Sequence, residues 1–119
     1  MASATKRSWA DGKARWLEAM RWRRQVEVTL KPFELTLARW LVLEATDELV
    51  RKTEDAVNQS EVAAHCELDR MTVSQVMRTL DELGLVDRGP AMAPPAYRII
   101  LTTKGAKLCR KVRAALSGA

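Results

Sequence analysis

The 119-residue sequence has very few histidines and cysteines. It contains one histidine, His65, and two cysteines, Cys66 and Cys109, which lie far apart and form no CxxC pair. A multi-histidine metal site is therefore excluded within one chain, and the cysteine spacing indicates neither a disulfide framework nor a metal site. No glycine-rich phosphate loop is present. We expect a structural role for the histidine, buried thiols with redox sensing as the alternative, no cofactor and no enzymatic activity.

Long hydrophobic runs are also absent. No apolar stretch approaches the roughly 18 residues that suggest a membrane span, and the N-terminal residues lack the hydrophobic segment of a signal peptide. We therefore expect a cytoplasmic protein. With 119 residues, of which 47% are hydrophobic, the chain is long enough for one domain with a modest core. We expect a flexible tail over residues 1–8 and a single domain over residues 9–119.

Charge is distributed unevenly along the chain. The net charge is +5 and the isoelectric point is near 9.6, which favours a polyanionic partner. Residues 1–31 carry eight basic and three acidic residues, whereas residues 32–87 carry five basic and twelve acidic ones. From Arg88 onward there are seven basic residues and no acidic ones. If the chain binds DNA, part of the charge that contacts phosphates must come from the segment that begins at Arg88.

The segment from Asn58 to Arg88 has the pattern of a helix-turn-helix followed by a strand. Two crossed helices must bury small or apolar side chains where they touch. Five positions satisfy this requirement, namely Val62, Ala63, Leu68, Val73 and Val76. The turn between such helices often uses glycine for a positive φ, but the corresponding residue is Glu67, so we expect a turn of a different build.

The second helix of this motif is predicted from about residue 70 to residue 83, with Asp69 as its cap and Gly84 at its end. Its apolar residues recur at three- and four-residue spacing and form one core-facing stripe. The opposite face carries five hydrogen-bonding residues, Arg70, Thr72, Ser74, Gln75 and Arg78. In a major groove, this face can contact base edges and phosphates. The alternative is an ordinary solvated helix face.

The first predicted helix starts near Trp9 and is ended by Pro32. It carries Trp9, Trp16 and Trp22 among several arginines. A small monomer has limited interior to cover three indole rings, so we expect a dimer interface to take part of their area. Alternatively, all three rings pack on their own chain or lie half-exposed.

The next helix is predicted from about residue 37 to residue 51 or 52, with Thr36 as its cap. Its apolar residues cover a wide arc, which indicates a central helix touched from several sides. Three acids on it, Glu44, Asp47 and Glu48, are expected to form a solvated face rather than an acid/base pair.

A short hairpin is predicted after Gly84, with strands at residues 85–86 and 97–101 and an irregular proline-rich tip at residues 89–96. Val57 is expected to add a short edge strand. The last helix starts at Thr102 or Thr103. The predicted fold class is mainly α with a small β-hairpin wing (α+β), a winged helix-turn-helix.

With these elements in this order, the sequence resembles the MarR family of bacterial winged-helix transcription regulators. The resemblance is carried by LTLARWLVL at residues 35–43, QSEVAAHCELDRMTVSQVMRTLDELGLVDR at 59–88 and LTTKG at 101–105. It implies a homodimer joined through the first and last helices, with the recognition helix in a major groove. The wing would then reach a minor groove or phosphates.

Carried over by position, the resemblance places seven residues at the DNA: Arg70, Thr72, Ser74, Gln75, Arg78, Arg88 and Arg98. Because the chain stops soon after one helix, dimerisation is expected to rest on Trp9, Trp16, Met20, Leu108, Val112 and Leu116. The family's wing usually carries an Asp-x-Arg signature before its second strand. Here that place is taken by Pro-Pro-Ala-Tyr-Arg at residues 94–98, without an acidic partner.

The leading hypothesis is therefore a homodimeric, sequence-specific regulator that binds double-stranded DNA. The alternative is a winged-helix module that docks another protein, with the acidic middle segment facing a basic partner. The arginines and glutamine of the second motif helix favour DNA, whereas the acidic middle and the altered wing favour the alternative. The resemblance also implies an unidentified small-molecule effector, whose pocket Trp40 and Met20 are candidates to line.

Overall fold

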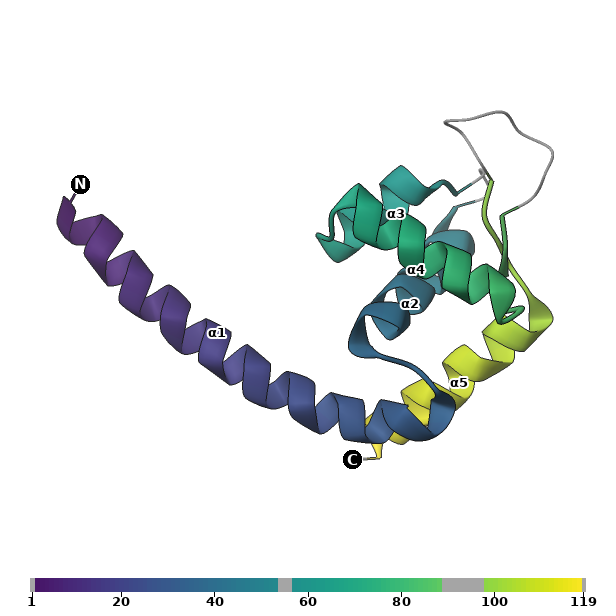
Figure 1. The fold of residues 1–119 in the computed structure, drawn as a ribbon, viewed down its shortest axis with the longest axis horizontal. Coiled ribbons are helices and arrows are strands. Elements are labelled where there is room, and N and C mark those ends of the chain that lie inside the picture. The colour runs from purple at the N-terminus through teal and green to yellow at the C-terminus, as the bar shows by residue number, and fades with distance from the viewer. Residues whose placement is uncertain (1, 54–56, 89–97, 119) are drawn as a thin grey trace.

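The computed structural model describes residues 2–53, 57–88 and 98–118 of the chain (Figure 1). The elements in chain order are α1 (Ala2–Leu30), η1 (Lys31–Phe33), α2 (Leu37–Lys52), α3 (Gln59–Cys66), α4 (Arg70–Glu82), β1 (Val86–Asp87), β2 (Ile100–Leu101) and α5 (Thr103–Ser117). This confirms the predicted class, a mainly helical fold with a small antiparallel hairpin. None of the described helices is long and apolar enough to cross a membrane.

Helix α1 begins at Ala2 rather than near Trp9, so most of the expected tail is helical. The reason is compositional, because residues 2–8 contain alanine, lysine and arginine and neither glycine nor proline. Only the second half of α1 packs on the rest of the chain, beside α2 and α5, while the first half points away from it (Figure 1).

Helix α2 lies at the centre of the fold, as its wide apolar arc predicted. It contacts α1, α3, α4, α5 and β2, and it buries Trp40, Val42 and Leu43. Thr36 caps its first turn, since its side-chain oxygen accepts a hydrogen bond from the Arg39 amide at 3.2 Å. The helix is therefore the support against which the helix-turn-helix is held.

Helices α3 and α4 form the predicted helix-turn-helix. Val62 and Val73 are fully buried where the two helices cross, and Ala63 is 5% exposed. The prediction for the turn was wrong, because Glu67 itself adopts the left-handed conformation, with φ of 56°. Its amide bonds back to the carbonyls of Ala63 and Ala64, so hydrogen bonding holds the residue in a conformation that a side chain normally disfavours.

The hairpin pairs β1 with β2, with Val86 opposite Leu101 and Asp87 opposite Ile100. The first strand therefore lies one residue later than predicted. Val57 adds the expected edge contact through an antiparallel bridge to Ile99. The predicted tip at residues 89–96 lies outside the described residues.

The start of α5 is fastened to the end of α4. The Thr102 hydroxyl donates to the Gly84 carbonyl at 2.7 Å and accepts from the Gly105 amide at 3.0 Å. The Lys104 ammonium donates to the Leu83 carbonyl at 2.8 Å, where a cation also suits the negative end of the α4 dipole. This junction holds the end of α4 against the start of α5.

Candidate nucleic-acid interface

The exposed helix α4 is held at its first turn by Asp69. One carboxylate oxygen of Asp69 accepts from the Thr72 amide at 3.0 Å, and the other accepts from the Thr72 hydroxyl at 2.5 Å. The hydroxyl bond and then the amide bond lower the pKa of Asp69 below its ordinary value of 3.8. The charged form of Asp69 is therefore the one that stabilises the start of α4.

This cap predicts an acid-sensitive contribution to stability. Because the folded-state pKa of Asp69 is lowered, the stabilisation is present above pH 3.8 and is lost as the pH falls through the lower folded value. Asp69→Asn should therefore unfold at lower urea concentration than the wild type near neutral pH. The gap between the two midpoints should narrow in acid, and a gap that stays constant as the pH falls would contradict this assignment.

The face of α4 opposite the core carries the predicted polar residues. The side chains of Arg70, Gln75 and Arg78 are exposed, whereas Ser74 is half-buried. Thr72 is also half-buried, and its hydroxyl is already engaged by Asp69. Of the predicted contacts on α4, the two arginines and the glutamine are the most accessible.

Met71 was missed as a candidate and is 72% exposed at the start of α4. Its spacing of two and six residues from Val73 and Met77 takes it off the core stripe, which was a usable signal. A flexible thioether beside exposed polar groups can make an apolar contact with the methyl group of a thymine base. Met71 therefore joins the candidate surface.

The base of the wing holds the other two predicted arginines. Arg98 is exposed, whereas Arg88 is half-buried and its Nε lies 3.5 Å from a carboxylate oxygen of Asp81. Their predicted DNA contacts remain predictions. This end of α4 is more acidic than its start, because Asp81 and Glu82 both lie there.

The acids of α2 do not form the expected solvated face. Asp47 is buried, and its carboxylate accepts hydrogen bonds from Arg51 at 2.6 Å and from Arg113 of α5. Burial alone would lower the pKa of Arg113, but the hydrogen bond and charge of Asp47 raise it, so the guanidinium stays charged. Glu48 also has a partner, the ring of His65 at 2.9 Å. These acids connect α2 to α5 and α3.

The two thiols are poorly suited to redox chemistry. Burial, and then the charge of Glu44, raise the pKa of Cys66 to about 11. Burial and the nearby Asp47 raise the pKa of Cys109 to about 11 as well. Both thiols therefore stay protonated at neutral pH, which makes them weak nucleophiles.

The six residues predicted for dimerisation differ in exposure. Trp9 and Trp16 are 71% and 60% exposed, and Met20 is half-buried. Leu108 and Leu116 are partly buried against their own core, and Val112 is fully buried within it. The tryptophans are available to a second copy, whereas Val112 supports the fold from inside.

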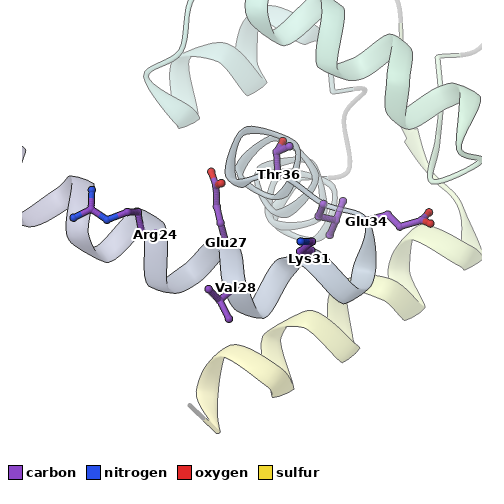
Figure 2. Close-up of a pocket in the computed structure, with 7 residues that line it drawn as sticks. Arg24, Glu27, Val28, Lys31, Glu34 and Thr36 are labelled. Carbon is purple, nitrogen blue, oxygen red and sulfur yellow. The ribbon is translucent and has the colours of Figure 1, made fainter.

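Two hollows flank the junction of α1 and α2. One is lined by Arg24, Glu27, Val28, Lys31, Glu34, Leu35 and Thr36. In Figure 2, Val28 and Glu34 point in other directions than Glu27 and Thr36. The side chains that line this hollow therefore do not converge on one point. The other is a groove of about 490 Å³ whose lining includes Trp40 but not the second predicted residue, Met20. Within the described part of the chain, no group of three or more histidine, cysteine or acidic side chains is placed to hold a metal.

Comparison by sequence gives one informative relative. No protein-family profile matches the chain. An uncharacterized HTH-type transcriptional regulator of Bacillus subtilis strain 168, YdcH, is 30% identical over 73 residues. The match covers 61% of this chain and 49% of that protein, so it spans about half the length of the relative.

Comparison by structure covers nearly the whole chain. The crystal structure of a MarR family transcription regulator superposes with a TM-score of 0.76, covering 99% of this chain and 76% of that one at 18% identity. The Mycobacterium tuberculosis transcriptional regulator MosR in complex with DNA superposes with a TM-score of 0.72, covering 89% and 74% at 22% identity. The chain therefore has the winged-helix fold of MarR family regulators.

Proposed function

We propose that this chain is a transcriptional regulator of the MarR type that binds specific double-stranded DNA as a homodimer. The observation that carries the proposal is the exposed face of α4, the second helix of the helix-turn-helix. Arg70, Gln75 and Arg78 are exposed to solvent on this face. Arginine and glutamine are the side chains whose geometry suits bidentate contacts with guanine and adenine in the major groove. The similarity to a regulator solved with DNA supports the same reading.

The proposed function is binding rather than catalysis. The proposed location is the bacterial cytoplasm, where the DNA lies. Phosphate contacts are expected from the basic residues of the wing and α5, because residues 32–87 are acidic overall. An unidentified small-molecule effector remains part of the proposal without an assigned site.

Selection of bound fragments from random duplex DNA tests this function. The wild type should enrich a palindromic site whose half-site spacing reflects a two-fold dimer. The double variant Arg70→Ala/Arg78→Ala should lose that enrichment while keeping its fold. If neither protein enriches a sequence, DNA recognition is refuted and the protein-docking alternative, which the acidic middle segment favours, takes its place.

A further inference from the structure

Most of the exposed residues of α4 form one row along the helix. The row consists of Met71, Gln75, Arg78 and Glu82, which follow one another at intervals of four, three and four residues. Because an α-helix turns by about 100° per residue, this spacing stacks the four side chains one above another. The buried residues of α4 lie on the opposite side of the helix. The row is therefore the part of α4 that projects farthest from the core.

Met71 is the apolar member of this row, and it is 72% exposed. Exposed apolar side chains occur on most protein surfaces, so exposure alone assigns no role. The position of Met71 is more informative, because Gln75 and Arg78 lie in the same row. An orientation of α4 that brings these two side chains to base edges also brings the Met71 thioether into the major groove.

The chemistry of the first turn of α4 favours an apolar contact there. The Thr72 hydroxyl donates to Asp69 at 2.5 Å, so its proton is not free for a base. The Met71 thioether donates no hydrogen bond and accepts one only weakly. The apolar group that duplex DNA presents in the major groove is the 5-methyl group of thymine. An unbranched, flexible side chain can adjust its position to that group.

We propose that Met71 is a specificity-determining residue that selects a thymine in each half-site through apolar contact with its 5-methyl group. The inference rests on the proposed function and adds a base that glutamine and arginine do not recognise. An α-helix rises about 1.5 Å per residue, so Met71 lies about 10 Å along α4 from Arg78. This length corresponds to about three base-pair steps of roughly 3.4 Å, which places both contacts within one half-site.

Replacement of thymine by deoxyuridine tests the contact, because it removes the methyl group and leaves base pairing unchanged. In the duplex enriched by the selection above, each thymine of one half-site is replaced in turn, and affinity is measured by fluorescence anisotropy. At one position the wild type should bind the uracil duplex about 4-fold more weakly, as expected for one methyl group withdrawn from an apolar contact. At that position, Met71→Ala should bind the thymine and uracil duplexes equally.

Methylated cytosine separates the effect of the methyl group from that of the base pair. At the same position, the wild type should bind 5-methylcytosine about 4-fold more tightly than cytosine, and Met71→Ala should not distinguish them. Met71→Leu keeps an apolar side chain and should retain a preference for the methylated base. Val28→Ala is the matched control, because Val28 is 75% exposed but lies on α1. It should keep the wild-type ratio between the thymine and uracil duplexes.

The outcomes separate this inference from the proposed function. Equal responses of the wild type and Met71→Ala to every uracil substitution would overturn the inference, while an enriched palindrome would still support the proposed function. A wild type that enriches no sequence refutes the proposed function and this inference with it.

Discussion

Gly105→Ala should lower the free energy of unfolding by at least about 2 kcal/mol. An added methyl group at this position would lie 2.1 Å from the Leu85 carbonyl oxygen and 2.9 Å from a methyl carbon of Leu101. The closest atom belongs to the backbone, so no side-chain rotation can relieve the contact. The whole start of α5 would have to move away from the end of α4.

Chemical denaturation of the variant beside Gly118→Ala measures this effect. Gly118 lies just after the same helix with φ of −82°, and among the described atoms an added methyl group would meet only the Ala114 carbonyl oxygen, at 3.5 Å. The control should therefore stay within about 0.5 kcal/mol of the wild type. Equal denaturation midpoints for Gly105→Ala and the wild type would contradict this prediction. They would mean that the start of α5 can move away from the end of α4 without loss of stability.

Features set by neighbouring residues were predicted well from the sequence. The caps at Thr36 and Asp69 are local, because each side chain bonds to an amide three residues later. The crossing of α3 and α4 was likewise encoded in the spacing of Val62 and Val73. The exposure of Arg70, Gln75 and Arg78 followed from the same helical periodicity.

Features that depend on distant partners were not predicted. Asp47 was expected in solvent, yet it is buried because Arg113 meets it from 66 residues away in the chain. Glu67 is a local exception: it was expected to avoid a left-handed backbone, yet its amide bonds to carbonyls three and four residues earlier and it adopts that conformation. Residues 2–8 of α1 were assigned to a tail because a helix without a packing partner leaves no periodic signal. Of these three cases, the Asp47–Arg113 contact is the one that a local window of sequence cannot contain.

Substitution of the exposed α4 residues should separate specific from non-specific DNA binding. Gln75→Ala or Arg78→Ala should each cost about 1–3 kcal/mol on the selected site, since each removes a side chain placed to bond a base edge. On random duplex DNA, Gln75→Ala should have almost no effect, because its amide carries no charge. Arg78→Ala should lose less there than on the selected site.

Lys107→Ala is the matched control, because Lys107 is an exposed cation on α5 rather than on the recognition helix. If its ammonium reaches phosphates, its removal should weaken selected and random DNA alike and reduce the dependence of affinity on salt. Fluorescence anisotropy titrations of both duplexes at several salt concentrations distinguish these patterns. Equal losses of affinity on both duplexes for Gln75→Ala and Arg78→Ala would show that α4 contacts the DNA backbone rather than the bases. The DNA sequence would then have to be recognised by another part of the chain.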